Sequence, residues 1–328
     1  MMNVSNIIIK NEQKTINLFN NKNFIRYFLD LKGNKSKYTS KSYERDIKDF
    51  FKVEYVEDIT IDHIRSVSIF DAQNYILELT SKNLSSATIN RKISSLSALY
   101  KWLLKYQDNS TGKVLIKYNP FGNLKEEKPV INNKDTEFLT KEECKILLQS
   151  IDTTSLIGIR NKAIMSLALT TALRKSEIIN IKLKDVTTYG NYNVINITRK
   201  GNVKDMVKIQ DGVLQLINQY VEKSNRDFKK NCDEYLFLGH SKNSIKKEKL
   251  NPSSLNYIIK EICKKANINK NLKVHSTRHT AITIAITEGA TIEKVREFAG
   301  HKNLATTNRY VHSIDKLKNN AGDIIDIL

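Results

Sequence analysis

The chain has 328 residues, of which 40% are hydrophobic and 27% charged, a composition typical of folded globular proteins. Its 54 Lys and Arg exceed its 35 Asp and Glu, so the formal net charge is +19. Self-repulsion on this scale opposes compactness, and a polyanionic partner usually compensates it. Nucleic acid is therefore favoured over an anionic membrane surface. We expect neither a membrane span nor a secretion signal, because apolar runs of about 20 residues and a signal-like N-terminus are both missing.

The positive charge is spread over both halves of the chain. Residues 1–137 contain 22 basic and 16 acidic residues, and residues 138–328 contain 32 and 19. Both halves are therefore predicted to contact the polyanion. Cys144, Cys232 and Cys263 are scattered and lack CxxC spacing. We expect them to be reduced cytosolic thiols, not members of a disulfide framework or a zinc site.

The first half is predicted to be an all-helical bundle over residues 13–124. Residues 1–12 lack periodicity and are interpreted as an N-terminal arm. Apolar residues at helical spacing predict helices over 14–31, after a cap at Thr39 or Ser40, from about Ile69, and from Ser86 to Leu103. The polar stretch 125–137, which contains Pro129, is interpreted as an interdomain linker.

The second half, residues 138–328, is predicted to combine helices with one β-hairpin. Thr140 and Glu143 form a capping signature for its first helix. Helices are expected over 159–170 and 175–180, a hairpin with strands 192–197 and 203–209, and helices over the remainder with a break at Gly300-His301. The fold class is thus mainly α with a small β-hairpin or sheet in the second domain.

Four segments of the second half carry residue types suited to phosphate chemistry. In chain order they are Thr170–Ile178 with Arg174, Arg199–Asn202 with Lys200, His275–His279 with Arg278, and Gly300–His312 with His301 and Tyr310. Arg174 lies at a turn into a helix, where backbone N–H groups favour an anion. His275 and Arg278 are three residues apart and share a helical face.

These residue types fit cleavage of a phosphodiester. The reaction passes through a phosphorane-like state with extra charge on the non-bridging oxygens, which the fixed donor forks of Arg174 and Arg278 would clamp. Tyr310 would attack the phosphorus. A phenol with a pKa of about 10 needs a proton acceptor, and His275 titrates in the right range.

The leaving 5′-oxygen also needs a proton, which Lys200 on the hairpin could donate. Lys204 and Lys208 are rivals for this role. His301 would hydrogen-bond the phosphate or position Tyr310. No metal is required, because side chains supply all the cations.

The order of these residues resembles the tyrosine recombinase family, also called phage-integrase-type or Xer-like site-specific recombinases. Arg174, Lys200, His275-x-x-Arg278, and Gly300-His301 with Tyr310 nine residues later carry the resemblance, which covers about 140–315. Residues 13–124 are similar to the family's core-binding (SAM-like) DNA-binding domain. Residues 138–328 would then be the catalytic domain with its C-terminal tail. Ala172 stands where the family usually has Gly, so we expect a slightly different turn there.

The resemblance implies a site-specific recombinase that cleaves and rejoins DNA through a covalent 3′-phosphotyrosine intermediate. It further implies a two-domain, C-shaped clamp on double-stranded DNA and a tetramer on two duplexes that exchanges strands through a Holliday junction. The implied partners are a DNA recombination site, other copies of the chain and an accessory DNA-bending or directionality protein. No cofactor is implied. The implied location is cytoplasmic and nucleoid-associated.

Several further residues are assigned supporting roles. Glu177 is interpreted as supporting the Arg174 turn, and His279 and His312 as structural or phosphate-adjacent. The apolar tail from Ile324 to Leu328 is predicted either to dock on a neighbouring subunit or to pack on its own chain. Candidates for DNA contacts in the first half lie near helix starts, with a solvated helix face as the alternative: Thr39, Lys41, Arg45, Asn90, Arg91 and Lys92.

Two other functions are compatible with parts of the pattern. A type IB topoisomerase uses similar Arg, Lys, His and Tyr chemistry, but the segment Gly300–Tyr310 and the separate helical half favour a recombinase. A regulatory DNA-binding protein with a vestigial site is disfavoured, because no member of the catalytic set is missing. The DNA target stays open, as does the choice between a mobile-element enzyme and a chromosome-dimer resolvase.

Overall fold

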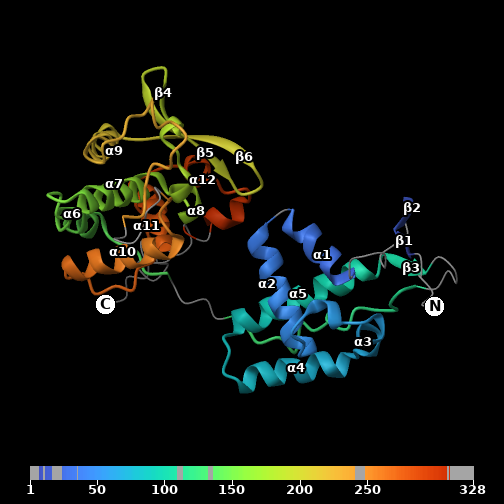
Figure 1. Cartoon of the computed structure of the whole chain (residues 1–328). Coiled ribbons are helices and arrows are strands. Elements are labelled where there is room, and N and C mark those ends of the chain that lie inside the picture. The colour runs from blue at the N-terminus through green and yellow to red at the C-terminus, as the bar shows by residue number, and fades with distance from the viewer. Residues whose placement is uncertain are drawn as a thin grey trace, which may run out of the picture. The chain divides into compact units, whose positions relative to one another are not determined.

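The computed structural model divides the chain into two compact units, Met1–Lys134 and Asp135–Leu328, each built mainly of helices (Figure 1). It describes residues 7–9, 12–16, 24–34, 36–108, 114–131, 136–240, 248–308 and 310. The division falls inside the predicted linker 125–137. The C-terminal tail from Ile324 to Leu328 and His312 lie outside the described residues.

The first unit is a helical bundle with a small antiparallel sheet. Its helices enclose a core that includes Phe28, Ile47, Leu96 and Tyr100. In chain order its elements are β1 (Ile7–Ile9), β2 (Glu12–Ile16), α1 (Phe24–Gly33), α2 (Lys37–Phe51), the 3-10 turn η1 (Val56–Asp58), α3 (Ile61–Ser66), α4 (Ile69–Ser81), α5 (Ser86–Leu103) and β3 (Tyr106–Asp108).

The prediction of an all-helical first half is wrong at its start. Residues 12–16 form β2 and 7–9 form β1, in a sheet of order β2-β1-β3, so the first helix begins at Phe24 instead of residue 14. The β-branched run at 7–9 has strand propensity. Its partner β3 lies about a hundred residues further along the chain, where no local pattern could indicate it.

The cap of the second helix also differs from the prediction. Ser36 caps α2 and accepts a hydrogen bond from the Thr39 backbone N–H at 3.3 Å. Ser40 lies inside the helix and donates to the Leu29 carbonyl oxygen at 2.9 Å. Ser36, Thr39 and Ser40 are all residue types that cap helices. The sequence is therefore compatible with several N-caps for α2, and in the structure, where α1 packs on α2, the earliest of them is used.

The second unit contains the longer of the two sheets. In chain order its elements are α6 (Lys141–Gln149), α7 (Leu156–Thr171), α8 (Lys175–Asn180), the 3-10 turn η2 (Leu183–Asp185), β4 (Val186–Tyr189), β5 (Tyr192–Arg199), β6 (Val203–Lys208), α9 (Asp211–Lys223), α10 (Pro252–Lys265), α11 (Val274–Thr287) and α12 (Ile292–Ala299). The predicted fold class, mainly α with a small sheet in this unit, is confirmed.

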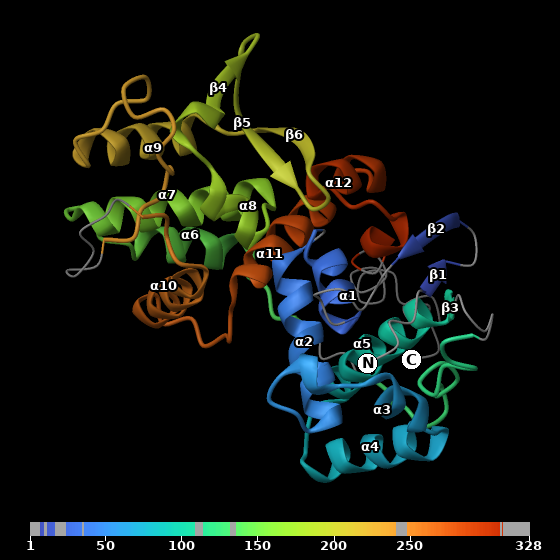
Figure 2. The ribbon, with the colours of Figure 1, turned by 45° about the vertical axis from the view of Figure 1, so that its right-hand side comes forward.

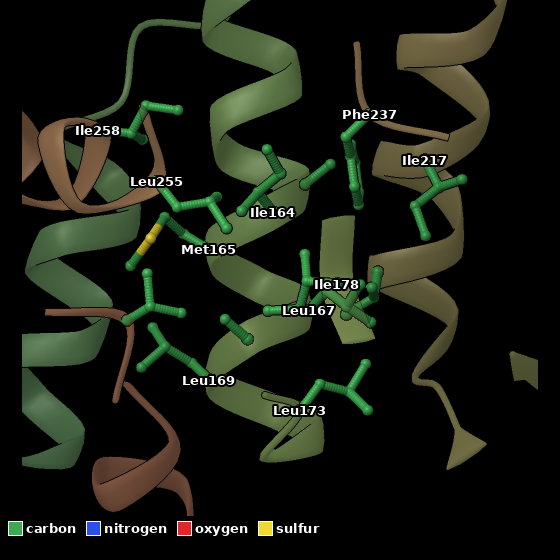
Figure 3. Close-up of a cluster of buried hydrophobic side chains, with 14 of the residues drawn as sticks. Ile164, Met165, Leu167, Leu169, Leu173, Ile178, Ile217, Phe237, Leu255 and Ile258 are labelled. Atoms are coloured by element: carbon green, nitrogen blue, oxygen red, sulfur yellow. The ribbon is translucent and has the colours of Figure 1, made fainter. Parts of the chain in front are cut away.

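Helix α7 is the centre of this unit. It is apolar on nearly all sides, as a helix buried in a core must be, and packs against α6, α9 and α11. Figure 3 shows Ile164 and Leu167 on α7 together with Ile217 and Phe237 from neighbouring segments. The C-terminal end of α7, which precedes Arg174, is therefore held by packing on several faces.

The sheet has the order β4-β5-β6 and is antiparallel throughout. β4 was not predicted. The turn between β5 and β6 contains Gly201 and Asn202, with φ of 91° and 60°, a backbone region in which Gly and Asn are tolerated. The alternation along β5 places Ile195, Ile197 and Arg199 on one face.

Two helices end in the left-handed conformation close to the predicted site. Ala172 terminates α7 with φ 49°, and Gly300 terminates α12 with φ 59°. Ala172 adopts the left-handed backbone conformation that favours glycine, the residue that the family usually has there. Both turns leave carbonyl oxygens of the last helical turn free for side-chain donors.

The prediction that the whole chain after the hairpin is helical is also wrong. The described residues between α9 and α10, 224–240 and 248–251, form irregular structure apart from two isolated β-bridges. Arg226 is buried there and donates to the carbonyl oxygens of Tyr235 and Leu236 at 2.8 and 2.9 Å. A buried guanidinium with several donors can satisfy backbone groups that no helix satisfies.

The cysteines and the apolar helices bear on two expectations from composition. The three cysteines are free thiols; Cys144 and Cys263 are buried and Cys232 is half-buried. In the part of the chain that the structure describes, no helix has the length and apolar character of a membrane span.

Candidate active site

Arg174 is held at the start of α8 by a carboxylate. Its backbone N–H donates to Glu177 Oε2 at 2.7 Å, and its guanidinium donates to Glu177 Oε1 at 3.0 Å. Glu177 itself is buried. Because backbone and side chain of Arg174 are tied to the same carboxylate, the half-buried guanidinium has little rotational freedom and faces the Gly300 carbonyl oxygen at 3.5 Å.

Arg278 lies on α11 and is only 2% exposed. Its guanidinium donates to the carbonyl oxygens of Ala172 and Ala299, both at 2.5 Å. These carbonyls belong to the ends of α7 and α12, where the helix dipole is negative and favours a cation. A guanidinium has five N–H donors, so Arg278 can bind a further acceptor without leaving these helix ends.

The positive charge in this region is only partly compensated. Burial, and then the neighbouring Arg174 charge, lower the pKa of Arg278 to about 10. Burial and the charges of Arg278, Arg174 and Arg199 lower the pKa of His301 to about 4. Burial together with Arg278 and Arg174 also lowers the pKa of His275. At neutral pH both histidines are neutral and both arginines are charged, which leaves a positive potential suited to an anion.

Tyr310 lies among these groups. Its ring centroid is 4.5 Å from that of His279 and 6.0 Å from that of His301, and it packs on the small cluster that includes Ala172 and Val295. Burial raises the pKa of the phenol, whereas the Arg278 and Arg174 charges lower it. The net pKa is raised, so the free site disfavours the phenolate, and the two arginines offset part of this cost to a nucleophilic tyrosine.

The two histidines of the predicted set have different surroundings. His275 lies at the start of α11, where part of its side chain reaches the surface while surrounding protein atoms still disfavour the charged imidazole. His301 is half-buried, with Nδ1 3.0 Å from the hydroxyl oxygen of the buried Thr307. This contact orients the His301 ring and leaves its Nε2 side for another partner. His279, predicted to be structural or phosphate-adjacent, has its ring stacked against Phe138 at 5.9 Å.

The three hairpin lysines are separated by the strand register. Lys200 is exposed in the turn, next to Gly201, whose Cβ position would lie 3.5 Å from Lys302 Nζ. Lys204 pairs with Thr198 near the turn, whereas Lys208 pairs with Val194 at the far end of β6. Lys208 Nζ lies over the Tyr192 ring, 4.6 Å from its centroid. The register thus favours Lys200 and Lys204 over Lys208.

Sequence reasoning missed Arg199 as a residue of this site. Its side chain is 9% exposed and forms an ion pair with Asp205 on β6. Its Nη1 donates to the Ala299 carbonyl oxygen at 3.4 Å. The alternation of Ile195, Ile197 and Arg199 on the inner face of β5 was the available signal, because it predicts that Arg199 points inward and Lys200 outward.

The candidates for DNA contacts in the first unit fall into two groups. Lys41 and Arg45 are exposed on α2, as a phosphate contact requires, and Thr39 is half-buried in the first turn of that helix. The three candidates on α5 are instead used within the unit. Asn90 donates to the Pro129 carbonyl oxygen, Arg91 donates to Ser42 and Asp46, and Lys92 donates to Asp49.

Lys92 is the clearest correction among these candidates. Its side chain is 10% exposed, and its Nζ lies 2.6 Å from Asp49 Oδ2 and 3.9 Å from Asp46 Oδ1. A buried ammonium between two carboxylates is neutralised and cannot reach a phosphate without breaking these contacts. Its position near a helix start, beside an apolar face, reflects packing of α5 on α2.

The second unit thus brings a tyrosine close to arginines and neutral histidines, side chains suited to attack on a phosphate. Comparison with known proteins gives the family. Residues 137–316 match the phage integrase family, and residues 24–107 match its N-terminal SAM-like domain. The chain belongs to this family and is a site-specific tyrosine recombinase.

The relatives cover nearly the whole chain. Tyrosine recombinase XerC of Staphylococcus epidermidis is 32% identical over 292 residues, which are 87% of this chain and 90% of the relative. XerC of Bacillus pumilus is 31% identical over 313 residues, 94% of this chain and 95% of the relative.

Solved structures show the same fold at lower identity. The Tn1549 transposon integrase in complex with transposon right end DNA is 20% identical with a TM-score of 0.67, covering 87% of this chain and 92% of that one. XerH site-specific recombinase bound to its palindromic difH substrate, in a post-cleavage complex, is 20% identical with a TM-score of 0.66, covering 85% and 76%.

Proposed function

We propose that this recombinase cleaves one strand of its DNA site by attack of Tyr310 on a phosphodiester, forming a covalent 3′-phosphotyrosine. The observation that carries the proposal is the position of Tyr310 beside His301, with ring centroids 6.0 Å apart, in a site whose buried Arg278 is held by main-chain carbonyl oxygens and so keeps a positive potential. Burial first, and then the Arg278 and Arg174 charges, lower the pKa of His275 and of His301; the same two charges offset part of the rise that burial causes in the pKa of the Tyr310 phenol. A transition state with extra negative charge on a pentavalent phosphorus relieves this potential.

Each group then has one task in the reaction. Arg278 and Arg174 donate to the non-bridging oxygens, and His275, neutral at pH 7, accepts the Tyr310 proton. The O–P bond to tyrosine forms as the bond to the 5′-oxygen breaks, and Lys200 supplies the proton to that oxygen. His301, oriented by its contact with Thr307, hydrogen-bonds the phosphate from its Nε2.

The larger assembly follows from the family and is likewise proposed. Four subunits would act on two duplexes and exchange strands through a Holliday junction. Each subunit would hold its DNA in a C-shaped clamp made of the core-binding domain 13–124 and the catalytic domain 138–328, joined by the linker 125–137. The biological setting would be integration or excision of a mobile element, or resolution of chromosome dimers, in the cytoplasm at the nucleoid.

The nucleophile is tested with a nicked suicide substrate, which traps the covalent adduct because the short cleaved strand diffuses away. Wild-type protein should give a protein–DNA band that denaturation does not remove. Tyr310→Phe should bind the same DNA with similar affinity and give no such band. An adduct formed by Tyr310→Phe would assign the attack to another residue, and wild-type binding without an adduct would favour a vestigial site.

The DNA interface is tested on α2, where the candidates are exposed. Lys41→Ala and Arg45→Ala should weaken binding and reduce the slope of log K against log salt by about 0.9 for each lost phosphate contact. Lys229→Ala, an exposed lysine beyond α9 in the other unit, is the matched control. An unchanged slope in both α2 variants would place the phosphate contacts elsewhere.

A further inference from the structure

We propose that Arg199 is a positioning residue that fastens the tip of the β5–β6 hairpin to the end of α12 and thereby holds Lys200 at the reacting phosphate. The inference rests on the proposed function, because it concerns how the proposed general acid is presented. Figure 2 shows the turn between β5 and β6 reaching the end of α12, where the Arg199 guanidinium meets the Ala299 carbonyl oxygen.

Arg199 is largely buried although its place in the chain predicts an exposed side chain. It is the last residue of β5 and adjoins an exposed turn, where an arginine would ordinarily extend into solvent. Its side chain is instead 9% exposed, and burying a guanidinium costs free energy unless it is paired and hydrogen-bonded. The contacts that offset this cost therefore indicate the structural role of Arg199.

Arg199 contacts three elements at once. Its Nε donates to Asp205 on the facing strand β6. Its Nη1 donates to the Ala299 carbonyl oxygen at the end of α12, at 3.4 Å, and lies 3.9 Å from Glu177 Oε2 on α8. A planar guanidinium can reach partners on several sides, whereas a lysine ammonium at this position could not span them.

Two of these partners are shared with the proposed phosphate clamp. Glu177 also holds Arg174, at 3.0 Å. The Ala299 carbonyl oxygen also accepts from Arg278, at 2.5 Å. Arg199 therefore links the hairpin to the same atoms that fix the two clamp arginines, so the place of the hairpin is set relative to the place of the phosphate.

Glycine at position 300 makes room for this contact. A Cβ built on Gly300 would overlap the Arg199 guanidinium. The neighbouring tip residue Gly201 would bring a Cβ to 3.5 Å from Lys302 Nζ. The hairpin tip thus lies directly against the segment Gly300–Lys302, and Lys200, between Arg199 and Gly201, is carried to the side of the site that contains His301.

Arg199 differs from the clamp arginine Arg278 in its charge balance. Asp205 and Glu177 both lie within ion-pair distance of its guanidinium, so its charge is neutralised by carboxylates. A phosphate would have to displace one of them. Its role is therefore to hold the backbone of the hairpin, and the chemistry belongs to Lys200, the next residue.

The proposal is tested with two suicide substrates that differ at one atom. In the first the leaving group is the natural 5′-oxygen, and in the second it is sulfur. With sulfur, the Tyr310 O–P bond forms and the P–S bond breaks, and the thiolate leaves without a proton because its pKa is only about 8.5. A variant that lacks only proton donation is therefore slow on the oxygen substrate and recovers on the sulfur substrate.

Lys200→Ala should be slowed by about 10²–10⁴ on oxygen and should approach the wild-type rate on sulfur. Arg199→Ala should be slowed by about 10-fold or more on oxygen, a part of that general-acid contribution, and should recover on sulfur in the same way. Arg199→Lys should lie between Arg199→Ala and wild type. Arg174→Ala, which removes a clamp donor, should be slow on both substrates.

Hydrogen exchange of the backbone amides at the β5–β6 turn gives a readout that does not depend on the chemistry. Arg199→Ala and Asp205→Asn should exchange faster at the turn than wild type. Lys204→Ala, on the facing strand, is the control and should exchange at the wild-type rate.

The outcomes separate the two proposals. If Lys200→Ala recovers on sulfur and Arg199→Ala does not, Lys200 keeps its role and the positioning role of Arg199 is wrong. If Lys200→Ala does not recover on sulfur, Lys200 is not the general acid. Faster hydrogen exchange at the β5–β6 turn in Arg199→Ala would then still support the role of Arg199 in holding the hairpin against α12. Unchanged exchange in that variant overturns the inference whatever the kinetics show.

Discussion

Both units hold basic side chains between helices, but they compensate the charge in different ways. In the first unit Arg91 and Lys92 of α5 meet carboxylates of α2, Asp46 and Asp49. In the second unit Arg278 of α11 donates to two backbone carbonyl oxygens at the ends of α7 and α12. A carboxylate cancels a positive charge, whereas a carbonyl dipole only orients it.

The difference separates charges that hold the fold from charges that are available to a ligand. An ion pair between α2 and α5 offsets the charges of both partners and leaves little field outside. A guanidinium held by helix ends keeps its full charge while its position is fixed, which is the preorganisation that transition-state stabilisation needs. By this criterion the first unit uses Arg91 and Lys92 for stability, and the second keeps Arg278 for phosphate. Arg174, which pairs with Glu177 but is half-buried, lies between these two cases.

The largest effect is expected at Arg278. Arg278→Ala should lower the rate of covalent adduct formation by about 10²–10³, as removal of one preorganised donor does, while DNA is still bound. Arg278→Lys should recover little, because an ammonium lacks the fork that spans two carbonyls and a phosphate oxygen. Single-turnover cleavage of a suicide substrate measures the rate. A loss of less than 10-fold in Arg278→Ala would remove the distinction between the units.

A smaller effect, on stability alone, is expected at Arg91. Arg91→Met leaves Asp46, which is fully buried, without its closest cation, and should cost about 1–3 kcal/mol. Hydrogen exchange of α2 and α5 in the full chain measures the loss. Asp46→Asn combined with Arg91→Met should restore part of the protection, because no unpaired charge is then buried. Adduct formation by the folded fraction should stay at the wild-type rate.

The burial and the positive charges around His301 should also lower its measured pKa. Its pKa of about 4 in the free protein lies below the ordinary value of about 6.5. As the pH falls from 6.5 to 4 the unfolded chain binds a proton that the folded chain does not, so stability is lost over this range. A bound phosphate should raise the pKa. NMR titration with and without DNA, with His301→Gln to assign the signal, measures both; a free-protein pKa near 6.5 would contradict the excess potential.

The smallest effect is expected at Ala172, whose carbonyl oxygen accepts from Arg278. Ala172→Gly relieves the left-handed strain of about 1–2 kcal/mol. It also loses a buried methyl group worth about 0.8 kcal/mol and adds chain entropy worth about 0.4–1 kcal/mol. The free energy of unfolding should therefore change by less than about 1 kcal/mol, and cleavage should be unchanged because the acceptor stays in place. A slowed cleavage would show that the methyl group orients the Arg278 acceptor.

Much of the fold was predictable where the signals are local. The capping box of Thr140 and Glu143, the helix over 175–180 and the Gly201-Asn202 turn all depend on neighbouring residues, and the structure shows each of them. The sheet of the first unit was not predictable, because β1 pairs with β3 from the far end of the unit.

The site was predictable as a set of residue types but not as a set of contacts. Arg174, Arg278, His301 and Tyr310 could be selected because phosphate chemistry needs those side chains in some arrangement. The acceptors that hold Arg278 are main-chain carbonyls, which every residue has, so the sequence does not identify them. Tertiary packing, which places the ends of α7 and α12 beside α11, determines which carbonyls are used.

Gly300 is constrained by two independent requirements, its left-handed backbone and the guanidinium that occupies its Cβ space. Neither requirement involves the reaction. In a descendant that had lost Tyr310 but retained Arg199, a side chain at position 300 would still be selected against. The glycine would therefore outlast the activity, and its presence in a divergent copy would report an intact hairpin contact and say nothing about whether that copy can still cut DNA.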